Sequence, residues 1–338
     1  MITLGIETSC DETAVGLVER GRTILGHSLV SSVPFHQRYG GVVPEIACRH
    51  HVELITYCLE DALRQAGLGL RDVGLVAVTY GPGLAGALLV GLAAAKGVSL
   101  GLSVPLVGVN HLQAHLYAAM LGQTRWPPRA VGLIISGGHT ALVRLEGLTR
   151  YTVMGQTRDD AVGEAFDKVA KLLELGYPGG PAIERTAQRG DPARVRFTTP
   201  RIKSGTPWDF SFSGIKTAVL RCVEEARRTG ALDDRFRADV AASFQHAVIE
   251  EVVAKAVSAC RATEARTLIV GGGVIANQAL RRRLAEQCRA ARLALRVPPV
   301  ALSTDNAAMV AGLGYQLHRV CRVTAPLTLT AEPNLGMR

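Results

Sequence analysis

The chain has 338 residues, of which 48% are hydrophobic and 20% are charged. This length exceeds what one small core usually serves, so we expect two domains, and the composition excludes a disordered chain. The formal net charge of +9 favours a polyanionic partner only weakly, because arginine-rich helices also serve as solvated surface.

Cysteine usage and the apolar segments define the compartment that we expect. The seven cysteines are scattered without a CxxC motif, which argues against a disulfide framework or a cysteine zinc site. The longest apolar run, GLAGALLVGLAAA, ends at Lys96 and is shorter than the roughly 20 residues of a membrane-spanning helix, so we expect a buried helix. The start, MITLGIETSCDET, lacks the basic region of a signal peptide. We therefore expect a cytoplasmic protein in a reducing environment.

The first part of the chain has the periodicities of three strands followed by alternating helices and strands. The predicted order is β-β-β-α-β-α-β. The strands are expected at 2–7, 14–19, 23–30, 73–79 and 104–109, with helices at 44–65 and after the loop GPGLAGALLVG.

The second part repeats this order of element types. Strands are predicted at 131–135, 141–145, 151–154, 268–270 and 295–297. Helices are predicted at 160–175, 214–228, 237–260, 277–292 and 305–320, and a polar, Pro- and Gly-rich stretch without regular structure at 177–206.

The repetition is also visible in the letters, since LGIETSCDETAVGLVE and GLIISGGHTALVRLE share one pattern of strand, polar turn and strand. A duplicated unit predicts an α/β fold of two lobes with mixed sheets, and ligands between the lobes in an interlobe cleft. We place the first lobe at 1–109, joined by about 321–338. The second lobe is expected at 110–320, with an inserted helical and loop region at about 177–236.

Three glycine-rich loops follow predicted strands, at 81–83, 136–138 and 271–273. Bare backbone N–H groups at such loops suit phosphate, although each loop alone is also typical of a tight turn. GxxxxGK[ST] is absent, and so is GxGxxG after a strand, which argues against a P-loop and a dinucleotide fingerprint. Asn277 follows the last loop and serves either as a helix N-cap or as a contact to a ligand.

The segment NHLQAH places His111 and His115 four residues apart on a predicted helix that Asn110 caps. Such a pair either holds a metal or has no common role. Asp305 is our candidate third ligand, with helix capping as the alternative. Two histidines and one carboxylate suit iron(II) or zinc. A zinc protease needs glutamate at position 112, and this chain has Leu112, which disfavours peptide hydrolysis.

The motifs GIETSCDETAV, NHLQAH, SGGHTALV, DDAVGEAFDKVAKLL, YPGGPAIE, FSFSGIKTAV, GGGVIANQALR and STDNAAMVAG, nearly end to end, resemble the bacterial tRNA N6-adenosine threonylcarbamoyltransferase family, formerly called glycoproteases or O-sialoglycoprotein endopeptidases. The resemblance implies the fold of actin, Hsp70 and sugar kinases (the ASKHA fold). It also implies transfer of threonylcarbamoyl from threonylcarbamoyl-adenylate to the N6 amine of the adenosine beside the anticodon, in tRNAs reading codons that start with A, with release of AMP.

The resemblance also implies site residues. One Fe²⁺ or Zn²⁺ would be held by His111, His115 and Asp305. Glu184 stands where many relatives carry aspartate. The adenylate would be bound by Ile134, Ile135, Ser136, Gly137, Gly138, Asp167, Gly180, Glu184 and Asn277.

The reaction itself needs a base for the amine proton, and our candidates are Glu12, Asp11 and His139, with a solvated turn as the alternative for the two acids. Two other functions remain open: a metalloprotease, which rests on the histidine pair, and a sugar-kinase-like or chaperone-like ATPase, which rests on the fold alone.

The resemblance implies four macromolecular relationships. The partners are tRNA, a shorter paralogous subunit that would form a heterodimer through the first-lobe helices near 44–65, a P-loop ATPase subunit, and a separate synthase that supplies the adenylate. No membrane partner is expected. Basic residues that could face tRNA are Arg201, Lys203, Arg227, Arg228, Arg281, Arg282, Arg283, Arg289 and Arg292.

Overall fold

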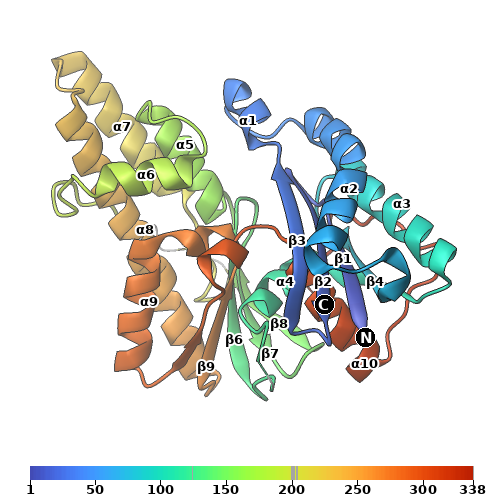
Figure 1. Ribbon diagram of the computed structural model, residues 1–338. Helices are drawn as coiled ribbons and strands as arrows, with labels where there is room; N and C mark the ends of the chain where they lie inside the picture. Colours follow the sequence, from blue (N-terminus) through green and yellow to red (C-terminus); the bar gives the residue numbers. More distant parts are fainter. Residues whose placement is uncertain (124, 199–201, 203–204, 338) are drawn as a thin grey trace. The chain divides into compact units, whose positions relative to one another are not determined.

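The computed structural model describes residues 1–123, 125–198, 202 and 205–337, and it divides into two compact units (Figure 1). The first unit comprises Met1–Pro127, Glu146–Tyr151 and Val297–Arg338, and the second comprises Pro128–Leu145 and Thr152–Arg296. Arg201 and Lys203, two of the predicted basic residues, lie outside the described residues.

The first unit is built on a five-stranded sheet with the order β3-β2-β1-β4-β5. β1 pairs antiparallel with β2, as β2 does with β3, whereas β4 is parallel to both β1 and β5. All five strands were predicted from the sequence. They are β1 (Ile2–Glu7), β2 (Glu12–Glu19), β3 (Thr23–Ser31), β4 (Val73–Gly81) and β5 (Leu106–Asn110).

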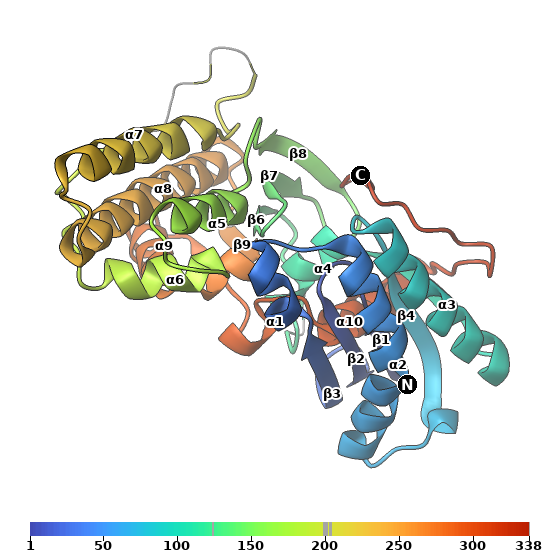
Figure 2. The ribbon, with the colours of Figure 1, turned by 90° about the horizontal axis from the view of Figure 1, so that it is seen from above.

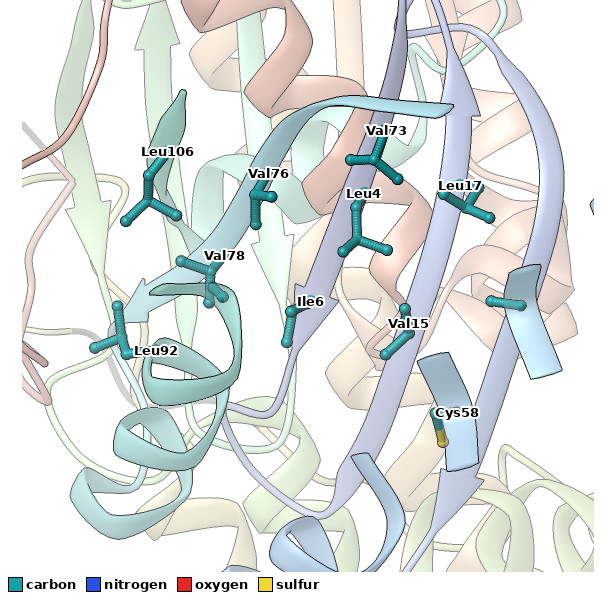
Figure 3. Close-up of a cluster of buried hydrophobic side chains, with 12 residues drawn as sticks. Leu4, Ile6, Val15, Leu17, Cys58, Val73, Val76, Val78, Leu92 and Leu106 are labelled. Atoms are coloured by element: carbon teal, nitrogen blue, oxygen red, sulfur yellow. The ribbon is translucent and has the colours of Figure 1, made fainter. Parts of the chain in front are cut away.

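One face of this sheet is covered by α2 (Pro44–Ala66) and α3 (Ala85–Leu102), which lie side by side. Alternate residues of the strands point to these helices, so Leu4, Ile6 and Leu17 form a cluster with Cys58 and Leu92 (Figure 3). These side chains are fully or almost fully buried, and the cluster is an apolar core of the first unit.

The other face is covered by α10 (Ala307–Cys321), the last helix of the chain, which contacts β1, β2 and β4. Glycines allow this close approach. A Cβ on Gly5 would lie 2.3 Å from the carbonyl oxygen of Ala307, and one on Gly314 would lie 2.3 Å from the Cβ of Ala77.

α4 (His111–Ala118) continues directly from β5 and packs on α10, so it also belongs to the first unit. The predicted division, which placed residues 110–320 in the second lobe, therefore differs from the structure for α4 and α10. Strand periodicity located the repeats but did not show that the chain returns to the first sheet after residue 296.

The second unit repeats the first sheet, with the order β8-β7-β6-β9-β10 when read from its antiparallel edge. β6 pairs antiparallel with β7 and parallel with β9, and β9 is parallel to β10. The predicted duplication is confirmed. The strands are β6 (Ala130–Ile135), β7 (Thr140–Leu145), β8 (Tyr151–Gln156), β9 (Thr267–Gly271) and β10 (Ala294–Arg296).

Most helices of the second unit follow β8 and precede β9 in the sequence. Among them, α7 runs alongside α8 (Figure 2). α6 was not predicted, because its segment is rich in Pro and Gly. Its Ala182 and Ile183 are buried, and Gly179 brings it against α5, since a Cβ there would lie 2.4 Å from the Cα of Asp167. The helices are α5 (Val162–Leu172), α6 (Gly179–Ala187), α7 (Ser213–Thr229), α8 (Asp234–Ala262) and α9 (Gln278–Ala290).

Short helical segments complete the described elements. They are α1 (Val33–His36) and the 3-10 turns Gln37–Tyr39, Leu70–Asp72, Gly273–Ala276 and Val300–Leu302.

The apolar helix α3 is only partly buried, which differs from the buried helix expected from its composition. Its length and composition would allow it to cross a membrane, a test that core helices of soluble proteins also pass. Ala87, Leu88 and Leu92 pack on the sheet, whereas Leu89 and Leu100 are exposed. The helix therefore has a second apolar face that the described chain leaves uncovered.

Candidate functional site

α4 presents the two histidines of NHLQAH from its first turns. Asn110 caps the helix as predicted, because its Oδ1 accepts hydrogen bonds from Leu112 N at 2.9 Å and Gln113 N at 3.3 Å. His111 and His115 follow one turn apart, with ring centroids separated by 4.5 Å. Both side chains are buried.

Asp305 lies against both rings, as the sequence predicted for a third ligand. Its Oδ1 is 3.0 Å from His115 Nε2 and 3.5 Å from His111 Nε2. The alternative of a helix cap is wrong, since Asn306 caps α10 by accepting a hydrogen bond from Met309 N at 2.9 Å. One potential ligand atom from each of the three residues lies within 4.8 Å of the other two.

Glu7 is a further residue of this site that sequence reasoning missed. Its fully buried carboxylate has Oε2 3.1 Å from His111 Nδ1, accepts a hydrogen bond from Thr79 Oγ1 at 2.6 Å and, through Oε1, one from Ser9 N at 2.6 Å. A carboxylate on Nδ1 makes that nitrogen a donor and leaves Nε2 facing Asp305. The available signal was an acid at the end of an otherwise apolar strand.

The charges of this cluster act on one another strongly. Burial disfavours the charged form of His111, but Asp305 and Glu7 outweigh burial and raise the pKa of His111 to about 9. Burial likewise raises the pKa of Glu7, and the charge and hydrogen bond of His111 reverse this, so that the pKa falls below its usual range. The buried carboxylate of Glu7 and the partly buried carboxylate of Asp305 thus favour a positive charge beside them.

These residues fit a metal ion. The ring nitrogens of His115 are buried and have no hydrogen-bond partner in the described part of the chain, although Nε2 lies beside Asp305 Oδ1. A buried polar atom without a partner is costly, and a cation between the three side chains would supply a partner for Nε2 of His115. Two imidazoles and one carboxylate, with the second nitrogen of His111 held by Glu7, form a donor set for iron(II) or zinc.

The turn between β1 and β2 brings Asp11 and Glu12 close to Asp305. One carboxylate oxygen each of Asp11, Glu12 and Asp305 lie within 4.8 Å of one another. Burial, with the neighbouring charges of Asp305 and Asp11, raises the pKa of Glu12 well above its usual range. These two acids are therefore not a solvated turn. His139, the third candidate base, belongs to the second unit, where its backbone N–H donates to Ser136 Oγ at 3.1 Å.

In the second unit, the predicted adenylate residues gather at the carboxyl ends of the parallel strands β6 and β9. Ile134 pairs with Gly271 in register, so the turn 136–138 and the loop 271–273 leave the sheet at the same edge. Gly272 has φ +100°, and a Cβ there would lie 2.4 Å from the carbonyl oxygen of Ile135. Glycine is therefore required where this loop crosses the end of β6.

The turn Ser136–Gly138 offers open backbone at this edge. A Cβ on Gly137 or Gly138 would meet nothing within 4 Å, and neither would one on Gly180 at the start of α6. By contrast, the loop at Gly81 and Gly83 in the first unit is packed, since a Cβ on Gly83 would lie 2.6 Å from Ser9 O. Close packing therefore explains the glycines of the loop 81–83, and the prediction that this loop binds phosphate gains no support.

Polar side chains at the same edge bind the first turns of two helices, α6 and α9. Asp167 Oδ1 accepts a hydrogen bond from Gly179 N at 2.7 Å, and Glu184 Oε1 accepts one from Gln278 N at 2.7 Å. Asn277 caps α9 through Leu280 N at 2.9 Å and donates to Gln245 Oε1 at 2.7 Å. Its capping role is confirmed, and the contact to a ligand stays a prediction.

Comparison with known proteins assigns the chain to a family. A family model described as tRNA N6-adenosine threonylcarbamoyltransferase matches residues 23–312. A relative of that name from Symbiobacterium thermophilum is 50% identical over 338 residues, covering 99% of this chain and 97% of the relative. The chain belongs to this family. Another relative of the same name, from Desulfitobacterium hafniense, is 47% identical over 334 residues, which cover 99% of this chain and 97% of the relative.

Solved structures of distant proteins share the fold of this family member. Full-length HypF in its phosphate- and nucleotide-bound form matches with a TM-score of 0.60 at 13% identity, covering 94% of this chain and 56% of HypF. Component A of the (R)-2-hydroxyglutaryl-CoA dehydratase from Acidaminococcus fermentans matches with a TM-score of 0.55 at 17% identity, covering 94% and 98%. Together with the repeated strand order, these likenesses confirm the predicted α/β fold of the actin, Hsp70 and sugar-kinase type.

Proposed function

We propose that this tRNA-modifying transferase moves a threonylcarbamoyl group from threonylcarbamoyl-adenylate to the N6 amine of an adenosine. The acceptor is the adenosine beside the anticodon in tRNAs that read codons starting with A, and AMP is released. The family assignment carries the transferase activity on tRNA. The cluster of His111, His115 and Asp305 is the structural observation that supports the site of the chemistry.

The chemistry of the acceptor explains the need for an activated donor. The lone pair of an exocyclic adenine amine is delocalised into the ring, so the amine is a weak nucleophile. A mixed anhydride of a carbamate and a phosphate is a strong electrophile. The amine nitrogen attacks the carbamoyl carbon, the bond from that carbon to the phosphate oxygen breaks, and the phosphate leaves as AMP.

The metal centre suits the charge that develops on this phosphate. His111, His115 and Asp305 would hold one Fe²⁺ or Zn²⁺, which as a Lewis acid would stabilise negative charge on the leaving group. Glu7 holds Nδ1 of His111, and its hydrogen bonds to Thr79 and Ser9 fix its own orientation. The coordination set is therefore pre-organised before any ligand binds.

Glu12 and Asp11 are the proposed bases for the amine proton. Glu12 is supported by its raised pKa, which brings a carboxyl closer to the value that proton transfer at neutral pH needs. Asp11 is supported by its position within the same acidic cluster. His139 is a third candidate from the second unit.

The carboxyl edge of the second sheet is the proposed site for the adenylate. The open backbone of Ser136, Gly137, Gly138 and Gly180 is suited to close contact with a nucleotide. Around this open backbone lie three polar side chains and the last two residues of β6. They are Ile134, Ile135, Asp167, Glu184 and Asn277.

Exposed arginines on and after α9 are the proposed contacts to tRNA. Arg282, Arg289 and Arg292 are exposed and have no ion-pair partner within the described ranges. Other predicted basic residues are neutralised, since Arg227 pairs with Glu174, Arg228 with Glu225 and Arg283 with Glu250. Among the predicted basic residues that the structure describes, Arg282, Arg289 and Arg292 are therefore the ones that we propose for phosphate contacts.

A partner surface is proposed on α2 and α3. Val52 and Tyr57 of α2 are 62% and 53% exposed, and Leu89 and Leu100 of α3 are 56% and 67% exposed. Exposed apolar helix faces of this kind commonly bind another protein. The proposed occupant is a shorter paralogous subunit, which would cover these helices with its own. A P-loop ATPase subunit and a synthase that supplies the adenylate are the other proposed partners.

The test is an assay of modified nucleosides. Metal-loaded protein and its partners are incubated with threonylcarbamoyl-adenylate and unmodified tRNA, and the digested tRNA is analysed by mass spectrometry. We expect a threonylcarbamoylated adenosine and a stoichiometric amount of AMP. An intact, metal-loaded complex that forms neither product refutes the proposal.

A further inference from the structure

Two buried histidines, His36 and His51, hold the acidic turn that carries Asp11 and Glu12. They come from α1 and α2, outside the metal cluster, and both side chains are 0% exposed. Their hydrogen bonds end on two consecutive backbone carbonyls of the turn, those of Cys10 and Asp11. The metal centre and the family resemblance leave these two residues unexplained.

His51 holds the carbonyl of Cys10. Its Nε2 lies 3.0 Å from Cys10 O, and because a carbonyl can only accept, Nε2 carries the proton. Nδ1 then accepts from Thr13 Oγ1 at 2.8 Å. Burial lowers the pKa of His51, which keeps the ring neutral and this tautomer complete.

His36 holds the carbonyl of Asp11 through one intermediate. The backbone N–H of Val43 donates to His36 Nδ1 at 3.2 Å, so Nε2 carries the proton and donates to Ser32 Oγ at 2.9 Å. Ser32 Oγ donates in turn to Asp11 O at 2.8 Å, and Ser32 N donates to the same oxygen at 2.8 Å. Burial lowers the pKa of His36 as well.

Both hydrogen-bond chains therefore fix the proton of each ring on Nε2. We propose that His36 and His51 are positioning residues, which lock the turn Cys10–Glu12 so that the two acids stay directed at Asp305. This inference rests on the proposed function, because it assigns the acids to the reaction. The position matters since displacement of a catalytic group by about 1 Å can cost about a hundredfold in rate.

The first test compares two serines that make the same bond. Ser32→Ala removes a buried hydroxyl that donates to Asp11 O at 2.8 Å, and Ser99→Ala removes one that donates to Val104 O at 2.7 Å in the same unit. We expect Ser32→Ala to lower kcat about tenfold with KM for the adenylate and metal content unchanged, and Ser99→Ala to leave kcat near the wild-type value. Equal kcat in the two variants overturns the proposal.

The second test uses His51 with two substitutions. Gln retains an amide N–H near the position of Nε2, whereas Leu removes the donor at similar volume. His51→Gln should recover most of the rate that His51→Leu loses. Adding His51→Leu to Glu12→Gln and Asp11→Asn together should cost little more, because the turn then carries no carboxylate to direct. Full additivity would show a general structural role and would contradict the proposal.

The third measurement does not need activity. Long-range ¹H–¹⁵N spectra of the wild-type chain, assigned with single-histidine variants, report the tautomer of each ring at pH 7. We expect the Nε2–H form for both His36 and His51, and an Nδ1–H form of either ring rejects its part of the network. A wild-type protein that makes no modified nucleoside but shows both Nε2–H forms refutes the proposed function and leaves the network intact.

Discussion

Glu7 Oε2 lies 3.1 Å from His111 Nδ1 in the interior of the first unit, where Glu7 is fully buried. This contact links the end of the first strand to the first residue of α4, which is more than 100 residues later in the chain. It explains why the histidine pair differs from an accidental one. Glu7 orients the His111 ring through Nδ1, and Nε2 of the same ring lies 3.5 Å from Asp305 Oδ1.

The relationship predicts that Glu7→Gln weakens metal binding without removing a ligand. The amide keeps the shape and can accept from Thr79 or Ser9, but it loses the charge that holds Nδ1–H of His111. We expect metal affinity to fall about 10- to 100-fold, measured by competition with a chromophoric chelator. Affinity equal to the wild type would show that Glu7 does not orient the ligand.

Removing Asp305 should lower metal content directly. Asp305→Ala deletes the carboxylate shared by both rings, so we expect well under half of the wild-type metal content by elemental analysis after dialysis. Asp72→Ala is the control, because Asp72 is an exposed acid of the same unit whose carboxylate only accepts from Gly69 N. Equal metal content in the two variants removes Asp305 from the ligand set.

Gly5→Ala should destabilise the protein by displacing α10, which follows Asp305. Its Cβ would lie 2.3 Å from Ala307 O and 2.6 Å from Ala311 N, and both are backbone atoms that cannot rotate away. We expect a loss of about 1–3 kcal/mol in the free energy of unfolding, with lower metal content.

Gly97→Ala is the matched control for this prediction. It introduces the same methyl group in α3, where a Cβ meets nothing within 4 Å, and should stabilise the protein by up to about 1 kcal/mol. Urea denaturation of both variants decides the matter. A Gly5→Ala protein as stable as the wild type would contradict the close packing of α10.

Asp209 in the second unit predicts a dependence of stability on pH. Burial raises the pKa of this carboxyl, but hydrogen bonds from Gln156 N, Arg158 and Thr206 N outweigh burial and lower it below the usual range. A depressed pKa contributes stability above the pKa of the unfolded chain, roughly 3.9, which is lost as pH falls through the folded value.

Asp209→Asn should therefore be less stable than the wild type at pH 7, by about 1–3 kcal/mol. The difference should shrink as the pH falls below about 4, because the carboxyl of the unfolded chain becomes protonated there before the carboxyl of the folded chain does. Urea titrations at pH 7, 4 and 3 measure it. A difference that does not change with pH would show that the charge of Asp209 is unimportant.

The proposed tRNA surface predicts a change in salt dependence. Arg282→Ala with Arg289→Ala should weaken tRNA binding and reduce the slope of log K against log salt, because two phosphate contacts are lost. Arg228→Ala is the control, since Arg228 is held by Glu225 at 2.6 Å. The slope is measured by filter binding at several salt concentrations. An unchanged slope in the double variant would contradict the prediction.

The sequence predicted the strands of both sheets and the histidine pair of the candidate metal site, because these follow local rules. Alternation identifies a strand, and His111 and His115 four residues apart on a helix share one face. α6 was missed because its helix depends on Gly179 packing against α5, a tertiary contact that outweighs its unfavourable composition. Glu7, His36 and His51 were missed for a similar reason, since their partners lie far away in the sequence or on backbone atoms.

The most direct test of the whole account is removal and restoration of the metal in the nucleoside assay. The wild-type complex is stripped with a chelator, assayed with threonylcarbamoyl-adenylate and tRNA, and then reloaded with Fe²⁺ or Zn²⁺. The account predicts that formation of threonylcarbamoyl-adenosine falls with metal content and returns on reloading, whereas Asp305→Ala does not recover. An undiminished rate in stripped wild-type protein would contradict it.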